Sequence, residues 1–191
     1  MNEYSPSLIL LINGKRKSGK DFFAELLHKR LGDERSVIVR LSAPIKSRFA
    51  QEYRLDYNKL LSDSDYKERY RQEMIVWGER MRAVDPGYFC RLALEMVPAA
   101  GRAPVWIVSD TRRRTDISWF RECYGERVKT VHIKANLTVR ELRGFVFTKG
   151  VDDAESECDL DGVADWDLTV LNNGDPRPLE EAVEAAVGWC P

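Results

Sequence analysis

The chain has 191 residues and a net charge of −1 at pH 7, from 30 basic and 31 acidic side chains. This length suits one α/β domain with a full core, and the balanced charge argues against a nucleic-acid partner. No apolar run is long enough to span a membrane, and the ends carry neither a secretory signal nor a peroxisomal tripeptide. We therefore expect a cytoplasmic, cytosolic monomer without a membrane partner. Its four widely spaced cysteines are expected to be free thiols, without a zinc pattern.

Short apolar runs alternate with helical patterns along the chain. We expect strands at residues 8–12, 36–41, 104–108, 128–133 and 167–171. We expect helices at residues 20–31, 42–53, 64–82, 86–97, 116–124, 136–144 and 178–187, with Ser42 and Asn136 as caps. This alternation predicts an α/β fold with a parallel sheet of about five strands, covered by helices on both faces. Ligands should bind at the rim formed by the carboxyl ends of the strands.

Residues 8–31 have the order apolar strand, glycine-bounded basic loop and helix. Gly14, Gly19 and Lys20 meet the spacing G-x-x-x-x-G-K of a P-loop, which binds the phosphates of a nucleotide. Glycine permits positive φ and close approach to an anion, and the helix N-terminus adds partial positive charge. Asp21 stands where Ser or Thr is usual, so it is expected to act on Mg²⁺ through water or to pair with a nearby cation. The alternative is an ordinary turn with solvated cations.

The predicted helix at residues 64–82 has two distinct faces. An apolar stripe suited to the core is formed by Tyr66, Tyr70, Met74, Trp77 and Met81. Lys67, Arg71 and Arg82 fall close together around the helix axis, which suits an anionic ligand. The alternative is a solvated face on which Glu68 and Glu79 pair with these cations.

The apolar strand at residues 104–108 is followed by Asp110 and then by Arg112, Arg113 and Arg114. This order is similar to a Walker B strand, whose terminal aspartate orients Mg²⁺ or its waters. Arginines crowded at a strand end favour an anion between them, and their guanidinium groups match phosphate. We therefore expect phosphate binding here, with an exposed turn as the alternative.

Three further features lie toward the C-terminus. Arg140 and Arg143 share one face of a short helix whose flanking glycines permit motion, so they predict either a lid or a plain surface helix. The acidic run at residues 152–157 favours the first turn of a helix over a cation site, within a stretch (148–167) predicted to be a mobile loop. Asn172 and Asn173 are expected to read an adenine edge or to make a turn.

A P-loop together with three cationic clusters exceeds what ATP alone requires. The surplus predicts an acceptor that is itself phosphorylated, and hence a small-molecule kinase. The chain lacks the N-K-x-D motif that reads guanine and the H-R-D and D-F-G motifs of protein kinases.

Five segments together resemble the animal-type phosphomevalonate kinase family. They are G-K-R-K-S-G-K-D at residues 14–21, Y-K-E at 66–68, D-P-G-Y-F-C at 85–90, V-S-D-T-R-R at 108–113 and G-V-D-D-A-E-S-E at 150–157. The likeness extends over residues 8–184, and the aspartate after the P-loop lysine is part of the family pattern. Vertebrate members tend to end in a peroxisomal-type signal, which this chain lacks.

The resemblance implies a nucleoside monophosphate kinase-like fold, in a single kinase domain with substrate-binding helices at about 42–97 and a lid at about 136–157. It implies that ATP and Mg²⁺ serve the conversion of (R)-5-phosphomevalonate to (R)-5-diphosphomevalonate in isoprenoid and sterol biosynthesis. We expect direct in-line transfer without a general base, because the attacking phosphate oxygen is already anionic.

The resemblance also implies roles for individual residues. ATP would contact Gly14, Lys15, Arg16, Lys17, Ser18, Gly19, Lys20, Asp21, Arg140, Arg143, Asn172 and Asn173. Phosphomevalonate would contact Lys67, Arg71, Arg82, Arg112 and Arg113. Lys17, Lys20 and Arg112 are the predicted catalytic residues, and Asp21 and Asp110 the predicted metal ligands, directly or through water.

Three alternatives stay open at this point. A nucleoside monophosphate kinase shares the fold but needs a site that reads a base. A non-catalytic ATP-binding module would release no ADP in response to an acceptor. A nucleic-acid binder would show a steep salt dependence of affinity.

Overall fold

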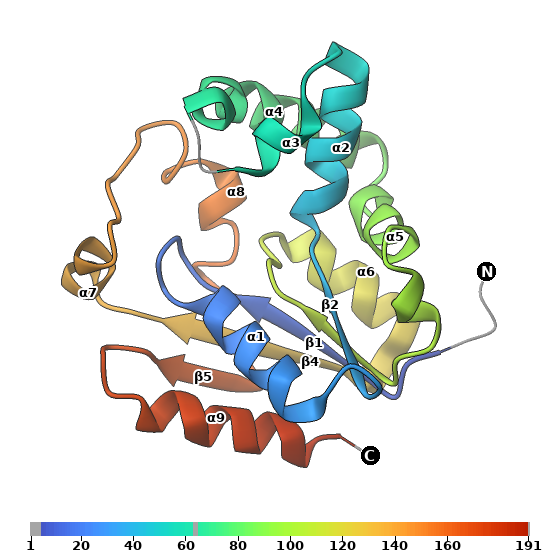
Figure 1. The fold of residues 1–191 in the computed structure, drawn as a ribbon, viewed down its shortest axis with the longest axis vertical. Helices are drawn as coiled ribbons and strands as arrows, with labels where there is room; N and C mark the ends of the chain where they lie inside the picture. The colour runs from blue at the N-terminus through green and yellow to red at the C-terminus, as the bar shows by residue number, and fades with distance from the viewer. Residues whose placement is uncertain (1–4, 63–64, 191) are drawn as a thin grey trace.

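Five parallel strands form one sheet in a computed structural model that describes residues 5–62 and 65–190 (Figure 1). The strands are β1 (Leu8–Asn13), β2 (Ser36–Val39), β3 (Val105–Val108), β4 (Val128–Lys134) and β5 (Leu168–Leu171). Their order is β2-β3-β1-β4-β5, so β1 lies at the centre. This arrangement confirms the predicted parallel sheet. The loops after β1 and β3 are adjacent because these two strands pair directly.

The helices follow the predicted order with small shifts at their ends. They are α1 (Lys20–Leu31), α2 (Ser42–Tyr53), α3 (Tyr57–Leu61), α4 (Asp65–Val84), α5 (Tyr88–Glu95), α6 (Arg114–Tyr124), α7 (Leu137–Leu142), α8 (Glu155–Cys158) and α9 (Arg177–Gly188). Short 3₁₀ turns occur at Pro98–Gly101 and Gly125–Arg127. Helix α3 was not predicted. The predicted start of α4, at Ser64, lies outside the described residues. The acidic run supplies the first turn of α8, as favoured, within the stretch predicted to be a mobile loop.

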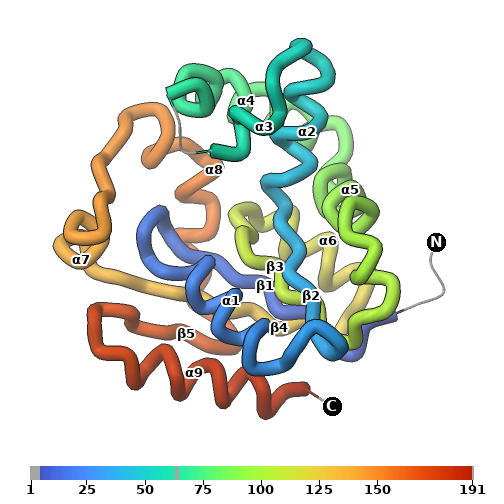
Figure 2. Tube along the Cα trace, in the orientation of Figure 1, coloured from blue at the N-terminus to red at the C-terminus, as the bar shows by residue number. Residues whose placement is uncertain are grey.

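Side chains alternate between the two faces of the sheet and build two cores. Leu8, Leu10 and Ile12 of β1 pack with α1 and α9 on one face. Ile9 and Leu11 pack with α5 and α6 on the other face. Figure 2 shows α1 and α9 lying side by side along the sheet. The period of two along β1 therefore buries both of its faces, as expected of a central parallel strand.

A third core joins α2, α3 and α4, which gather beyond one end of the sheet, to the start of α5 (Figure 1). The indole of Trp77 lies 5.8 Å from the ring of Phe49 and 5.7 Å from that of Phe89, measured between centroids. Met74 and Trp77 are buried, and the other residues of the predicted stripe pack against them. The predicted apolar face of α4 is thus confirmed. The opposite side of this helix stays available for polar contacts.

The carboxylate of Asp110 caps α2, which corrects the prediction that Ser42 does so. Its two oxygens accept hydrogen bonds from the backbone N–H groups of Leu41 (2.6 Å) and Ser42 (3.0 Å). A carboxylate satisfies these otherwise unpaired donors and interacts favourably with the helix dipole. Asn136 is the N-cap residue of α7, as predicted, but its side chain makes no capping hydrogen bond.

The described residues contain no helix that is both long and apolar enough to cross a membrane. All four cysteines lie within the described residues and are free, as predicted. Cys90 is the buried one, and burial raises the pKa of its thiol. It is therefore a packing residue rather than a reactive thiol.

His132 on β4 gives a pH-dependent stability that can be measured. Burial, assisted by Lys134, lowers its pKa from 6.5 to about 4, and its ring lies 4.7 Å from that of Trp166. Between these two pH values the unfolded chain takes up a proton that the folded protein refuses, so stability falls as pH falls from 6.5 to 4. Denaturant titrations should show a smaller loss for His132→Phe. Equal losses in both proteins would show that His132 is protonated in the folded state.

Candidate active site

The P-loop joins β1 to α1 and has a tightly constrained backbone. Positive φ occurs at Gly19 (96°) and at Lys17 (63°), whereas Gly14 does not have it, which corrects one expectation. Gly14 is required for space instead. A Cβ there would lie 2.4 Å from Ser18 Oγ and 2.7 Å from the carbonyl oxygen of Ile133. The hydroxyl of Ser18 is buried and finds no hydrogen-bond partner within the described residues, so it is available to a ligand of the loop.

Arg140 of α7, Arg143 directly after that helix and an amide after β5 contact the outside of the loop. Arg140 Nε donates to the carbonyl of Arg16 at 2.7 Å, and Arg143 Nη1 donates to the carbonyl of Ser18 at 3.1 Å. Arg143 Nη2 also donates to Asn172 Oδ1 at 3.1 Å, while Asn172 Nδ2 donates to the carbonyl of Ser18 at 2.9 Å. The predicted lid arginines therefore lie against the P-loop. Direct contact of these groups with a nucleotide stays a prediction.

Asn173 and Asp21 each have a protein partner. Asn173 Oδ1 accepts from the backbone N–H of Asn136 at 2.8 Å, which ties the turn after β5 to the start of α7. The carboxylate of Asp21 accepts from Lys20 Nζ at 2.8 and 3.0 Å. The expected pairing of Asp21 with a nearby cation is thus observed. The side chain of Lys20 is only 10% exposed, whereas that of Asp21 is 57% exposed. The ammonium group of Lys20 is therefore largely buried, and its carboxylate partner lies at the surface.

An acidic segment, residues 152–161, neutralises two cations of the loop. Lys15 Nζ donates to Asp161 Oδ2 at 2.8 Å and to the backbone carbonyl of Glu157. Arg16 pairs with Asp152 at 2.9 Å, and the carboxylate of Asp152 is only 6% exposed. The stretch around α8 therefore packs on the P-loop through charge. Lys15 and Arg16 face this segment, and their predicted contact with ATP stays a prediction, as does that of the exposed Lys17.

A buried carboxylate that the sequence analysis missed positions the arginines after β3. Asp116 Oδ2 accepts from the backbone N–H groups of Arg112 (3.2 Å) and Arg113 (3.1 Å). Asp116 Oδ1 lies 3.6 Å from Arg82 Nη2, and this guanidinium also lies 4.8 Å from the ring centroid of Phe89. Burial raises the pKa of Asp116, whereas Arg82 and the two N–H groups act in the opposite direction. Asp116 thus links α4 to the loop after β3.

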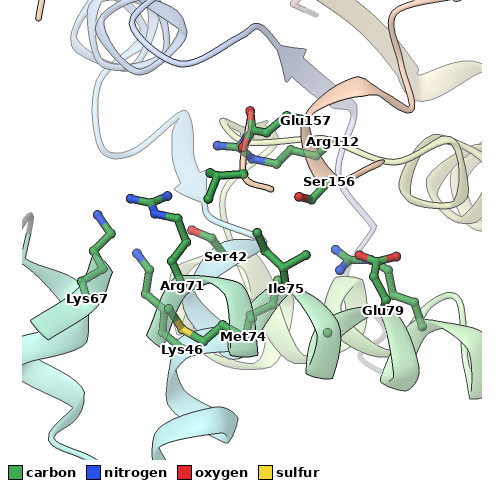
Figure 3. Close-up of a pocket in the computed structure, with 14 residues that line it drawn as sticks. Ser42, Lys46, Lys67, Arg71, Met74, Ile75, Glu79, Arg112, Ser156 and Glu157 are labelled. Carbon is green, nitrogen blue, oxygen red and sulfur yellow. The ribbon is translucent and has the colours of Figure 1, made fainter. Parts of the chain in front are cut away.

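A cavity of about 200 Å³ lies between α2, α4, α8 and the loop after β3. Its basic lining residues are Lys46, Lys67, Arg71, Arg82 and Arg112, and its apolar ones include Ile45, Met74, Ile75 and Val151. Figure 3 shows Lys46, Lys67 and Arg71 reaching toward the same part of the cavity, with Arg112 beside α8. The cavity combines several cations with an apolar wall, and the carboxylates of Glu79 and Glu157 also line it. It therefore fits a small anionic molecule with an aliphatic body.

The predicted substrate residues are mostly brought together here. Arg71 also pairs with Glu68, and this hydrogen bond lowers the pKa of Glu68 and raises that of Arg71. Arg113 is the exception, because its guanidinium is buried against Glu79 and does not line the cavity. The structure gives Arg113 a supporting contact with Glu79, and its predicted contact with a ligand stays a prediction.

Lys46, Ser156 and Glu157 line the cavity but were not predicted as site residues. Lys46 lies one helical turn after Ser42 on α2, and with Arg48 close by nothing in the sequence distinguished it from a solvated cation. Ser156 and Glu157 sit in an acidic run, whose usual meaning is a helix start.

The described residues hold no cluster of three His, Cys, Asp or Glu side chains suited to a metal ion. Mg²⁺ in nucleotide sites is often held by one or two carboxylates together with phosphate oxygens and water, so this finding is compatible with a nucleotide-borne ion. Asp21 and Asp110 are the candidates. Asp21 is exposed near the loop, whereas the oxygens of Asp110 already bind the start of α2.

The strand order, the P-loop and the adjacent cationic cavity define a P-loop kinase fold. TT1252 from Thermus thermophilus has a TM-score of 0.54 at 18% identity, covering 96% of this chain and 98% of that one. The APS kinase CysC from Mycobacterium tuberculosis, solved with AMPPNP and APS, has a TM-score of 0.54 at 13% identity, covering 97% and 98%. At such identities these matches establish the fold.

Sequence comparison then gives the family. A model of the phosphomevalonate kinase family matches residues 12–126. Phosphomevalonate kinase from Drosophila melanogaster is 51% identical over 177 residues, covering 92% of this chain and 93% of that protein. The chain belongs to the phosphomevalonate kinase family, which confirms the resemblance read from its motifs.

The close contacts around Gly14 predict that a side chain at this position weakens nucleotide binding. Gly14→Ala should destabilise the protein by about 1–3 kcal/mol, because the new methyl group meets backbone as well as Ser18. Nucleotide affinity, measured by calorimetry, should fall about tenfold or more. Gly188→Ala is the control, since its Cβ would enter open space at the end of α9. A Gly14→Ala protein with unchanged affinity would contradict this account of the loop.

Proposed function

We propose that the protein transfers the γ-phosphoryl group of ATP to (R)-5-phosphomevalonate, forming (R)-5-diphosphomevalonate and ADP in isoprenoid and sterol biosynthesis. Membership of the phosphomevalonate kinase family supports this assignment. The structural observation that carries it is a cationic cavity beside the P-loop. The two sites are joined through Thr111, whose N–H donates to the carbonyl of Ile12 (3.1 Å) and whose carbonyl accepts from Asn13 (2.9 Å). Arg112, the next residue, lines the cavity.

The cavity matches the chemistry of this acceptor. Phosphomevalonate has a phosphate at one end, a carboxylate at the other and an aliphatic middle with a methyl group. Arg82 and Arg112 lie on the side of the cavity formed by the loop after β3 and would receive the phosphate. Lys67 and Arg71 on α4 would receive the carboxylate, and Met74 and Ile75 offer an apolar wall. Arg113 holds Glu79 and supports this wall from behind.

Transfer is proposed to proceed in line, from ATP directly to an oxygen of the acceptor phosphate. That oxygen is already anionic near neutral pH, so the chain supplies no general base. Lys17, Lys20 and Arg112 offset the charge repulsion between the two phosphates and align them. Arg140 and Arg143 keep the loop in shape and close it from the lid side. Ser18 offers a buried hydroxyl to the bound phosphates.

Mg²⁺ would supply further neutralisation at the ATP phosphates. Asp21 is the proposed carboxylate for it, directly or through water, with Asp110 as a second that also caps α2. Asn172 and Asn173 are proposed to lie near the nucleotide, behind the loop that they brace. We propose action in the cytosol, as a monomer built from one kinase domain, with a small-molecule partner and no nucleic acid.

The activity is tested by coupled detection of ADP release with a panel of acceptors. Phosphomevalonate should support turnover, whereas nucleoside monophosphates should give little above the acceptor-free rate. The cavity offers cationic side chains for the phosphate and the carboxylate of phosphomevalonate, and the sequence shows no motif for reading a base. Turnover with a nucleoside monophosphate alone would favour the nucleoside monophosphate kinase alternative, and ATP binding without turnover would favour a non-catalytic module.

The catalytic assignment is tested by Lys20→Ala and Arg112→Ala. Each should lower kcat by about a thousandfold, since each removes a cation directed at the transferring group. Thermal unfolding should change far less than kcat. Arg121→Ala, an exposed arginine on α6, is the matched control and should retain normal kcat. Near-normal turnover of either test variant would remove that residue from the catalytic set.

A further inference from the structure

The cavity contains an anion supplied by the protein itself. The carboxylate of Glu157 on α8 contacts the guanidinium of Arg112, and both side chains line the cavity. Figure 3 shows the two side chains together at one wall. The side chain of Glu157 is 9% exposed and that of Arg112 27%, so the pair is shielded from solvent screening. Arg112 is therefore neutralised by a carboxylate of the protein itself.

The position of Glu157 is fixed by contacts from both sites. Lys15 of the P-loop donates to the backbone carbonyl of Glu157 and also pairs with Asp161. On the other side, the backbone N–H of Arg114 donates to Asp159 Oδ2 at 2.8 Å. The helix carrying Glu157 is thus attached to the P-loop and to the loop after β3. These contacts hold the carboxylate of Glu157 next to Arg112.

We propose that Glu157 is a positioning residue that withholds Arg112 from ATP until a phosphorylated acceptor displaces it. The proposal rests on the proposed function in taking ATP as donor and a phosphate as acceptor. The phosphate of an acceptor in this cavity carries about −1.5 to −2 charges near pH 7 and binds arginine in bidentate fashion. It therefore competes with the carboxylate of Glu157 at close range, whereas the ATP phosphates would be held in the P-loop. A water molecule offers no such charge. Glu157 thereby favours transfer to the acceptor over transfer to water.

The reaction that Glu157 suppresses is ATP hydrolysis. In that reaction a water oxygen bonds to the γ-phosphorus as the bond to the ADP oxygen breaks. The water proton goes to solvent, and the products are ADP and inorganic phosphate. A free Arg112 stabilises the charge of this transition state as well as that of the productive one. Pairing with Glu157 removes that stabilisation while the acceptor is absent.

The test compares Glu157→Gln with the parent protein. The neutral amide no longer competes for Arg112, so inorganic phosphate, used as the probe, should bind about tenfold more tightly by calorimetry. ADP release without acceptor should rise about tenfold. Glu155→Gln, an exposed residue of the same helix, removes the same charge and should change none of these values.

A purely structural ion pair predicts the opposite sign. In that case Glu157→Gln would loosen α8, weaken phosphate binding and lower kcat, and acceptor-free ADP release would not rise. Either weaker phosphate binding or unchanged acceptor-free ADP release would overturn the proposal. Both readouts are independent of phosphomevalonate. Failure of the parent protein to turn over phosphomevalonate would therefore count against the proposed function, and not against the role of Glu157.

Discussion

Repulsion among cationic side chains is the constraint on which the whole site depends. Binding two phosphates requires lysines and arginines to be crowded, yet the protein must also be stable without them. The structure resolves this conflict with internal anions. Asp161 and Asp152 neutralise Lys15 and Arg16, and Glu157 neutralises Arg112. Since all three carboxylates lie in residues 152–161, one segment balances the charge of both the P-loop and the adjacent cavity.

The parallel sheet sets the relative positions of the P-loop and the arginines after β3. Because β1 and β3 pair in parallel, the P-loop and the arginines after β3 emerge side by side. Two buried carboxylates then fix what surrounds them. Asp110 holds the start of α2, and Asp116 holds the backbone of Arg112 and the guanidinium of Arg82. Neither side chain needs to touch a ligand in order to determine the shape of the cavity.

Much of this could be predicted from the sequence, because the signals are local. Apolar runs and glycine spacing located the strands and the P-loop, and helical periodicity located the buried stripe of α4. The failures involve partners distant in the chain. The cap of α2 comes from Asp110 rather than from the adjacent Ser42, and Glu157 lies 45 residues from Arg112. Such pairings leave no periodic pattern, and the positive φ of Lys17 is set by its loop rather than by its residue type.

The cap on α2 has a mechanical consequence. Asp110 holds the start of α2 at the end of β3, so a rotation of this helix would pivot near Leu41. The third core packs α3 and α4 against α2, so these helices would move with it. A rigid rotation about this pivot would move Lys67 and Arg71 farther than Arg112, because Arg112 lies two residues from Asp110. Such a rotation would therefore change the width of the cavity while leaving Arg112 in place.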